Sequence, residues 1–478
     1  MLARSAAIRA FTRRDGVRLF AFALAVALVL GTVLAIGAFI DPFGNRLQRM
    51  AGWYLLAALV VGLLLGWIWR FRPQIWNRSS ALLLITVLSI GASVAIKVTS
   101  GRPVLPYVVP TMAVGLLLAV LIDGGTALLV TGLLALLGGA ITGTVEFAAY
   151  SLLGGMAGVI LVRRGERFGH FAQAAIAIGV VNVGVVTLFT LLSNRDFTGL
   201  AELYGAGLAA AAGSAVAALG SFVVVGSLFG ITTSFQLLEL ANPTQKLLRR
   251  LMLEAPGTYN HSLLVGNLAE RAAEAIGADP LLARVAAYYH DVGKLANPLA
   301  YIENQGGGEN VHDELTPEES VALVKAHVAR GIDLAYEYRL PKPVIAFIPQ
   351  HHGTALISYF HARAQERAAN VDDAHFRHSG PKPQSREAAI LMLADGVEAS
   401  VRSLSDHDEP TIRAMVERII RERLDDGQFD ECDLTLRDLE RIREAFVAQL
   451  LGMYHRRVEY PQNKIVEIES RRAAGNSH

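Results

Sequence analysis

Histidine and aspartate residues, two side-chain types that bind metal ions, are concentrated in the second half of the chain. Twelve of the thirteen histidines follow residue 260. Two adjacent pairs and three single residues make up the candidate ligands: His261, His290, Asp291, His327, His351, His352 and Asp395. These imidazoles and carboxylates are enough to hold two divalent cations, and paired cations cleave phosphate esters. The residue types predict a dinuclear metal centre, although spacing alone does not distinguish one from packed or surface histidines.

The ligand types also indicate which metals and which substrate such a centre would suit. Imidazole-rich sets favour Fe, Mn, Co, Ni or Zn over Mg or Ca, which prefer oxygen ligands. Two divalent cations carry more charge than Asp291 and Asp395 neutralise, so the centre would attract a phosphodiester and lower the pKa of a water. Lys294, one turn after Asp291, is either a catalytic group that neutralises a phosphate oxygen or an ordinary salt-bridge partner. Asp291 and Lys294 are therefore the candidate catalytic residues.

The segments that must position these ligands are predicted to be helical. Across residues 258–460, apolar residues recur at helical spacing and β-branched alternation is scarce. The motif Thr-Pro-Glu-Glu at 316–319 combines a capping threonine, a proline at the first helical position and a glutamate at the third. The helix that it starts carries His327. The other ligands are expected early in the helix after Pro256-Gly257 (His261), at the ends of two helices (His290-Asp291, and His351-His352 after Pro341), and inside the helix 385–403 (Asp395).

The adjacent pair His290-Asp291 requires a particular local geometry. Successive residues on a helix are about 100° apart, so the two side chains cannot face one point in the middle of a helix. At a helix end they can serve neighbouring ions, with the Asp291 carboxylate bridging them. The same argument allows His351 and His352 to contribute to two metals. Five further histidines of this half, His312, His361, His375, His378 and His407, are expected to lie on the surface.

The first half of the chain has the composition of a membrane protein. The 478 residues are 52% hydrophobic overall, yet only four charged residues occur between Ala81 and Val162. The net charge of +1 averages two unlike halves and gives no indication of a polymeric nucleic-acid partner. The single cysteine, Cys432, cannot form an internal disulfide, which suits a reducing compartment.

Eight apolar segments are long enough to be candidate spans of a lipid bilayer. They lie at about 18–40, 51–69, 81–98, 106–122, 126–142, 144–162, 169–192 and 203–232. An even number places both ends of the bundle on one side, and the arginine-rich segment before the first span and the loop containing Arg70, Arg72 and Arg78 fall there. By the positive-inside rule that side is the cytoplasm. The predicted domains are an N-terminal transmembrane anchor (1–41), a multi-span membrane domain (51–232), a linker helix (233–256), a soluble domain (257–460) and a tail (461–478).

At His290-Asp291-Val-Gly-Lys294 the chain resembles the HD-superfamily metal-dependent phosphohydrolases. Five further motifs resemble the PgpH-type membrane-anchored HD phosphodiesterases, which are seven-transmembrane receptor proteins that hydrolyse cyclic di-AMP. These motifs begin at Gly257 (Gly-Thr-Tyr-Asn-His-Ser), Tyr301 (Tyr-Ile-Glu-Asn-Gln), His351 (His-His-Gly-Thr), Gly380 (Gly-Pro-Lys-Pro-Gln) and Asp426 (Asp-Gly-Gln-Phe-Asp-Glu-Cys-Asp). The resemblance covers residues 240–460 and extends less specifically through the membrane bundle.

The resemblance implies an all-α fold in which a multi-span helical bundle is followed by a cytoplasmic all-helical HD domain in the bacterial inner membrane. It implies that the seven candidate ligands hold two iron or manganese ions and that the product is pApA. It places substrate near Lys294, Asn304, Gln305, Tyr359 and Phe360. An amide can hydrogen-bond an adenine edge and an aromatic ring can stack on it; alternatively, the two aromatic residues belong to the core and Gln305 to the glycine loop that follows it.

One feature departs from the family pattern. Family members carry a large extracytoplasmic domain between the first two spans, whereas here about ten residues, 41–50, connect them. The departure puts control by an external ligand in doubt. Whether the chain forms a homo-oligomer is left open.

Other functions fit the sequence less well. A cyclic di-GMP phosphodiesterase of the HD-GYP type should show His-His-Glu and a Gly-Tyr-Pro loop, but this chain has His351-His352-Gly353-Thr354 and no such tripeptide. Hydrolysis of guanosine alarmones or another nucleotide, and a receptor whose HD domain binds nucleotide without cleaving it, are the alternatives. A transporter is disfavoured because no intramembrane charge network is apparent. The sequence therefore predicts a membrane-anchored phosphodiesterase with cyclic di-AMP as substrate.

Overall fold

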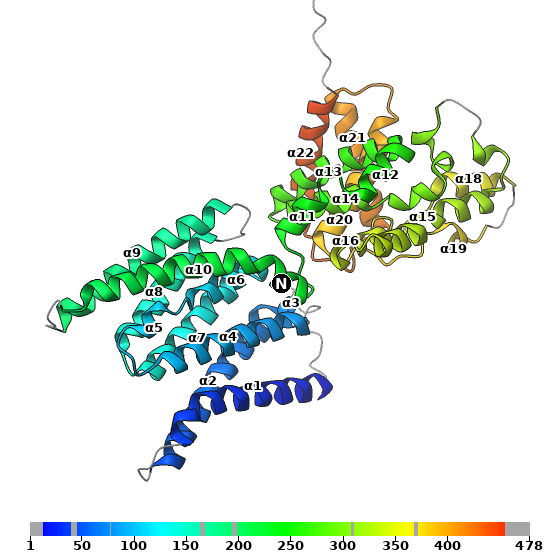
Figure 1. Ribbon diagram of the computed structural model, residues 1–478. Helices are drawn as coiled ribbons and strands as arrows, with labels where there is room; N and C mark the ends of the chain where they lie inside the picture. Colours follow the sequence, from blue (N-terminus) through cyan, green and yellow to red (C-terminus); the bar gives the residue numbers. More distant parts are fainter. Residues whose placement is uncertain are drawn as a thin grey trace, which may run out of the picture. The chain divides into compact units, whose positions relative to one another are not determined.

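The computed structural model describes residues 13–39, 45–76, 78–162, 168–193, 198–306, 310–367 and 371–454. These residues form two compact units, which divide between Gln236 and Leu237. The described chain is almost entirely helical and contains no strand, only an isolated bridge between Leu356 and Arg377, so the predicted all-α class is confirmed (Figure 1). The predicted tail, 461–478, lies outside the described residues.

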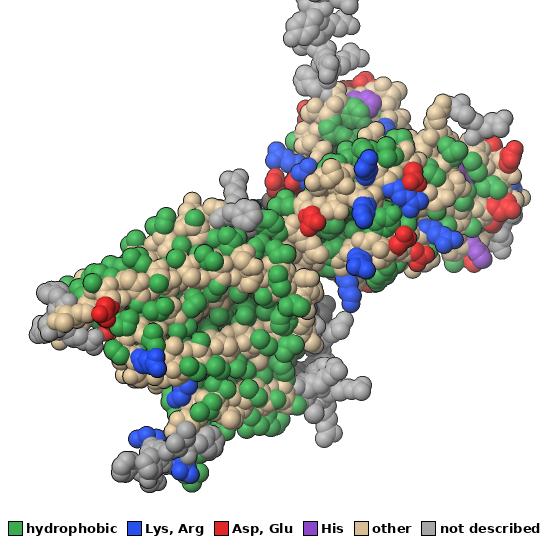
Figure 2. Space-filling view, in the orientation of Figure 1, with side chains coloured by type: hydrophobic (Ala, Val, Ile, Leu, Met, Phe, Trp, Pro, Cys, Tyr) green, Lys and Arg blue, Asp and Glu red, His purple; other side chains and the backbone are tan. Residues whose placement is uncertain are grey.

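The first unit is a bundle of apolar helices. Its helices are α1 (Arg13–Phe39), α2 (Arg46–Phe71), α3 (Pro73–Trp76), α4 (Ser79–Thr99), α5 (Leu105–Val108), α6 (Met112–Leu121), α7 (Gly124–Thr142), α8 (Val145–Val162), α9 (Phe168–Leu192) and α10 (Leu200–Leu228). Seven of them are long and apolar enough to cross a membrane: α1, α2, α4, α7, α8, α9 and α10. Large apolar side chains such as Leu59, Ile176 and Val216 point outward, and Figure 2 shows few charges on this unit. The length and the apolar exterior of these helices are those of a multi-pass membrane protein.

The predicted span 106–122 is not the continuous helix that we expected. Pro110, which cannot donate a backbone hydrogen bond, lies where the segment breaks into α5 and α6. The two short helices still carry the chain from one end of the unit to the other. Before them, Lys97 near the end of α4 lies beside Gly37 near the end of α1. After them, Leu121 at the end of α6 packs against Gly226 near the end of α10. Together α5 and α6 therefore cross the unit, although only seven of the eight predicted segments contain a described helix long enough to span a membrane on its own.

The second unit is helical with short 3₁₀ segments. Its elements are α11 (Ser234–Leu240, which crosses the unit boundary), α12 (Lys246–Glu254), α13 (Pro256–Ile276), α14 (Pro280–Tyr289), η1 (Val292–Ala296), η2 (Pro298–Ala300), η3 (Ile302–Asn304), η4 (Val311–Asp313), α15 (Pro317–Glu337), α16 (Lys342–Ile345), α17 (Phe347–Gln350), α18 (Ser358–Arg367), α19 (Asp373–Phe376), α20 (Arg386–Arg402), α21 (Glu409–Asp425) and α22 (Leu436–Met453). The unit carries most of the charged side chains visible in Figure 2.

Helix α13 lies at the centre of this unit. It packs against α14, α20 and α22, and its buried residues Val265 and Leu268 share a core with Leu391 of α20 and Phe446 of α22. Residues Leu247, Leu248 and Leu251 of α12 are buried in a second cluster, which also contains residues of α14 and α16. The segment predicted as a linker helix thus belongs to the second unit from residue 237 onward.

Candidate metal centre

The end of α14 positions the His-Asp pair. Asp279 caps the start of α14 by accepting a hydrogen bond from the Leu282 backbone N–H, and the helix ends at Tyr289. His290 follows at the C-terminal cap, and Asp291 has left helical geometry (φ −109°, ψ 13°) before η1 begins. Because the helix ends between them, the two side chains can turn toward one centre, as the sequence predicted.

Two glycines allow the turn after Asp291 to approach α15. A Cβ atom at Gly293 would lie 1.8 Å from the backbone oxygen of His327, so only glycine fits there. Gly331, one turn further along α15, faces the same backbone. This backbone-to-backbone contact brings Asp291 and His327 together and explains the glycine in the His-Asp-Val-Gly-Lys motif.

The other ligands lie where the sequence placed them, with one difference. His261 is in the second turn of α13, Asp395 is inside α20, and α15 starts with the predicted capping box of Thr316 and Glu319. His351 and His352 do not close one long helix. Two short helices, α16 and α17, precede them, and His351 is the cap of α17.

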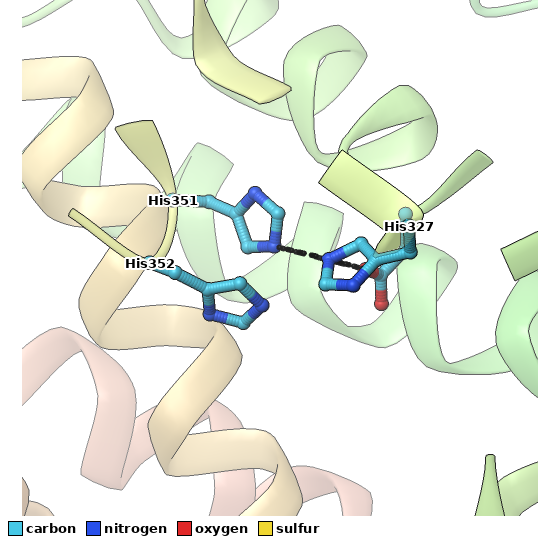
Figure 3. Close-up of side chains that lie close together, drawn as sticks. His327, His351 and His352 are labelled. Carbon is cyan, nitrogen blue, oxygen red and sulfur yellow. Dashed lines mark hydrogen bonds and ion pairs between the residues drawn. The ribbon is translucent and has the colours of Figure 1, made fainter. Parts of the chain in front are cut away.

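The seven predicted ligands converge in two groups. Asp291, His327, His351 and His352 form one, and His261, His290 and Asp395 form the other; within each group the ligand atoms lie within 4.8 Å of one another. Figure 3 shows the three imidazoles of the first group, with the Nε2 atoms of His327 and His351 3.5 Å apart. The backbone thus assembles two candidate cation sites side by side.

The two oxygens of Asp291 divide between these groups. Its Oδ1 lies 3.4 Å from His327 Nε2 and 3.7 Å from His351 Nε2. Its Oδ2 lies 3.2 Å from His290 Nε2 and 3.7 Å from His261 Nε2. A carboxylate in this position can bridge two cations.

Asp395 also faces both groups. Its Oδ1 is 3.0 Å from His261 Nε2 and 3.7 Å from His290 Nε2, and its Oδ2 is 3.8 Å from His352 Nδ1. Because each group is lined by both carboxylates, neither candidate cation would be held by neutral imidazoles alone.

Backbone carbonyls orient three of the imidazoles. The Nδ1 atoms of His290, His327 and His351 lie 2.6, 2.5 and 2.6 Å from the carbonyl oxygens of the residues three positions earlier. When Nδ1–H donates to a carbonyl, the lone pair of Nε2 is left for a cation. Each of these three Nε2 atoms points into the cluster.

A fourth imidazole is oriented by Glu398, which the sequence analysis did not identify. His261 Nδ1 lies 2.5 Å from Glu398 Oε2, and the Glu398 side chain is fully buried. Glu398 is one turn after Asp395 on α20, so the spacing Asp-x-x-Glu was the available signal. Its partner lies 137 residues away in sequence, which is why the pairing could not be predicted locally.

The burial and charge of the cluster favour ionised carboxylates but shift the pKa values of its imidazoles in opposite directions. Burial would raise the pKa of Asp291, but His290 and Lys294 hold it well below its usual value. Burial lowers the pKa values of His351 and His352 well below normal. Burial would also lower the pKa of His290, but Asp291 raises it to about 10, so a cation at that atom would displace a proton.

Two atoms of the cluster are buried without hydrogen-bond partners: His290 Nε2 and Asp291 Oδ1. Unsatisfied buried polar atoms are costly and usually have an explanation such as an ion. Together with the imidazole and carboxylate donors, they fit a pair of transition-metal ions.

Lys294 is held between two carboxylates. Its Nζ lies 2.7 Å from Asp291 Oδ2 and 2.7 Å from Glu303 Oε1, and it stands 4.9 Å from the centre of the Tyr301 ring. Burial would lower the pKa of Lys294, but both carboxylates raise it, so the ammonium stays charged. Two of its three N–H groups are used, leaving one for another acceptor.

The Asn304 side chain makes hydrogen bonds within the protein in this structure. Its Oδ1 accepts hydrogen bonds from the backbone N–H groups of Gly257 and Thr258, at 2.9 and 3.2 Å. Its Nδ2 donates to Thr258 Oγ1 and to the Pro298 carbonyl. The amide that we predicted to hydrogen-bond an adenine edge thus already makes four hydrogen bonds within the protein. Gln305 likewise donates from Nε2 to the Leu299 carbonyl and to Asn310 Oδ1.

The predicted aromatic pair separates into one buried and one exposed residue. Phe360 is only 7% exposed and packs with Val321, Ala364 and Phe376 in a small core, which supports the structural alternative for this residue. Tyr359 is 65% exposed, and its ring is therefore available for stacking.

Three histidines expected on the surface lie elsewhere. His312 and His361 are buried, and the His378 ring stacks on His352 with centroids 4.1 Å apart. Burial, together with the positive charge of Lys325 and Arg423, lowers the pKa of His378 to about 3. His378 was not predicted because its partner is adjacent only in the folded chain.

The chain matches two protein-family models. Residues 47–233 match the model described as a 7TM receptor with intracellular HD hydrolase, and residues 258–400 match the HD domain model. The first match begins after α1 and covers α2 to α10, so it includes the broken segment α5–α6.

Two curated relatives are named cyclic-di-AMP phosphodiesterase PgpH. The protein of Bacillus subtilis (strain 168) is 35% identical over 432 residues, which are 87% of this chain and 61% of that protein. The protein of Listeria monocytogenes serotype 1/2a (strain 10403S) is 39% identical over 323 residues, 67% of this chain and 45% of that protein. The chain thus spans about three fifths or less of the length of these relatives.

Two solved structures also match part of the chain. The crystal structure of the L. monocytogenes phosphodiesterase PgpH HD domain is 44% identical, with a TM-score of 0.43, and covers 44% of this chain and 100% of that one. A second structure, of the same domain in complex with cyclic-di-AMP, has the same identity and TM-score and covers 45% and 99%.

Proposed function

We propose, from the premise that the chain belongs to the family of 7TM receptors with an intracellular HD hydrolase, that its soluble unit hydrolyses cyclic di-AMP to pApA at a two-metal centre. The observation that carries the proposal is the division of the Asp291 oxygens between two histidine groups. A single-metal site would not need seven inward-facing ligands, nor a carboxylate shared between them.

Two divalent iron or manganese ions at this centre would supply Lewis-acid polarisation of a phosphodiester and an activated water. His327, His351 and His352 would hold one ion, His261, His290 and Asp395 the other, and Asp291 both. The carbonyl oxygens behind His290, His327 and His351 fix the ring orientations, so little reorganisation is needed on loading.

The protein's own groups have distinct roles in this proposal. Lys294 orients Asp291 by an ion pair and directs its remaining N–H toward a phosphate oxygen, where positive charge stabilises the transition state. Glu303 keeps that ammonium in place from the other side. Hydrolysis adds one water across one P–O bond of the cyclic dinucleotide, which opens the ring and leaves a linear product with a terminal phosphate.

The choice of cyclic di-AMP rests on the names of the relatives. Both curated relatives are named for hydrolysis of cyclic di-AMP. The exposed ring of Tyr359 is the remaining candidate for stacking on a base, since Phe360 is buried. Asn304 and Gln305 contribute to substrate binding only if their present hydrogen bonds are exchanged for bonds to the ligand.

The orientation in the membrane follows from charge. Arg72 lies 3.3 Å from Asp123, at the same end of the first unit as the Leu121–Gly226 contact. Arg70, Arg72 and Arg78 lie at this end, in the connection between α2 and α4, and the chain continues from the end of α10 here into the second unit. On the positive-inside rule we propose that this end faces the cytoplasm, with the HD domain inside the cell at the bacterial inner membrane.

The test is hydrolysis by the purified full chain in detergent, loaded anaerobically with Mn²⁺ or Fe²⁺. Cyclic di-AMP and cyclic di-GMP are offered in parallel, and the products are separated by chromatography against a pApA standard. The doubly substituted His290→Ala/Asp291→Ala chain is the control. We expect pApA from cyclic di-AMP and none from the control. Binding without cleavage would favour the receptor alternative, and faster turnover of cyclic di-GMP would contradict the assignment of the base.

A further inference from the structure

The candidate metal centre opens to solvent at one edge. The side chains of His352 and Asp395 are 25% and 17% exposed, whereas the other five ligands are at most 3% exposed. A substrate must therefore approach the centre past His352 and Asp395, and the residues around these two ligands are the first that it meets.

His378 lines this opening. Its ring stacks on that of His352 at 4.1 Å with an angle of 29° between the rings, and the tilted ring of His351 lies 3.8 Å from that of His352. The backbone N–H of His378 donates to the Ala355 carbonyl, which fixes the segment. The His378 side chain is partly exposed, so its ring can meet a ligand at this edge.

Two cations, Arg423 and Lys325, lie close enough to His378 for their charges to help lower its pKa. The Arg423 guanidinium of α21 lies beside Gly396, the residue that follows Asp395, and its Nε is buried without a hydrogen-bond partner. Lys325 of α15 donates from Nζ to the carbonyl of His375, three residues before His378, at 2.7 Å. Among the described residues neither cation forms an ion pair with a carboxylate, although most arginines of this unit do.

We propose that Arg423, Lys325 and His378 form an anion subsite beside the metal centre, which holds the phosphate of the cyclic dinucleotide that is not being cleaved. A cyclic dinucleotide carries two phosphodiesters, so when one lies at the metal centre the other needs its own positive partner. Arginine binds phosphate oxygens through paired N–H groups, and Lys325 keeps two free N–H groups after bonding to His375. The identity of the ligand rests on the proposed function.

The test compares a substrate with one phosphate and a ligand with two. The full chain is loaded with Mn²⁺, and hydrolysis of bis(p-nitrophenyl) phosphate, a one-phosphate diester, reports the metal centre. Cyclic di-AMP is then added as a competing ligand, and its inhibition constant is measured whether or not it is cleaved. The variants are Arg423→Gln and Lys325→Gln, and Arg418→Gln on the exposed face of the same helix α21 is the matched control.

We expect each variant to raise the inhibition constant of cyclic di-AMP roughly tenfold, because a charge-assisted hydrogen bond is lost. The Michaelis constant for the one-phosphate diester should change several times less, and the bound Mn²⁺ per chain should match the wild type. Equal weakening of both ligands, loss of metal, or no inhibition of the wild type by cyclic di-AMP would overturn the subsite. Cleavage of cyclic di-AMP is measured separately, so the proposed function can fail while the subsite stands.

Discussion

The Nδ1 atom of His261 lies 2.5 Å from Glu398 Oε2, and both side chains are at least 97% buried. A carboxylate in this position fixes the orientation of the imidazole and increases its basicity toward a metal. The second oxygen of Glu398 lies 3.4 Å from Arg402, which is partly exposed and screens the carboxylate. Glu398 is thus a positioning residue for one of the two histidine groups.

Replacing Glu398 by alanine should weaken metal binding about 10–100-fold, the range typical of such carboxylate partners. Metal content after dialysis against graded Mn²⁺ measures the effect without using activity. Glu398→Gln should recover part of the affinity, because its amide oxygen can still accept from His261. Glu366→Gln on the exposed face of α18 is the control. Unchanged Mn²⁺ affinity in Glu398→Ala would exclude the positioning role.

Gly293→Ala should disrupt the centre without touching a ligand. The new methyl group would meet the His327 backbone, and separating η1 from α15 should cost about 3 kcal/mol or more, because overpacked backbone cannot easily move. Chemical denaturation and metal content are the two measurements. Gly452→Ala, in α22 with nothing near its Cβ position, should be neutral or stabilising. A fully metallated, equally stable Gly293→Ala protein would contradict the packing argument.

The variant Asn304→Ala distinguishes a structural role of this residue from a role in binding the adenine base of the substrate. Losing the cap on the backbone N–H groups of Gly257 and Thr258 should lower the free energy of unfolding by about 1 kcal/mol. Asn304→Asp keeps the accepting oxygen and should recover part of this loss. If Asn304 instead binds the base, both variants would raise the Michaelis constant for cyclic di-AMP while stability stayed the same.

Cys432 should react slowly with thiol reagents. Burial, with a contribution from Asp433, raises the pKa of Cys432 to about 11, so little thiolate is present at pH 8. Alkylation by iodoacetamide at pH 8 should be roughly 100-fold slower than in the unfolded chain and should accelerate up to about pH 11, because only the thiolate reacts. Mass spectrometry of timed samples measures the rate. Equal rates in the folded and unfolded chains would refute the shift.

The features that could be predicted from the sequence depend on residues that are close together in the chain. The Thr316–Glu319 capping box lies within one turn, and the helix end at His290-Asp291 follows from ligand geometry, so both were found where predicted. Phe360 and Tyr359 are neighbours of similar type, and only the packing of α18 on α15 decides which one is buried. The roles of Asn304, Glu398 and His378 depend on partners 26 to 137 residues away, which spacing alone does not reveal.

The central claim is that Asp291 joins two metal sites that act together. The most direct measurement is the titration of metal-free full chain with Mn²⁺, following bound metal per chain and hydrolysis of cyclic di-AMP in the same samples. We predict that hydrolysis rises only as the second Mn²⁺ binds and that Asp291→Ala abolishes it. Full activity with one Mn²⁺ per chain, or two bound ions without hydrolysis, would contradict the account.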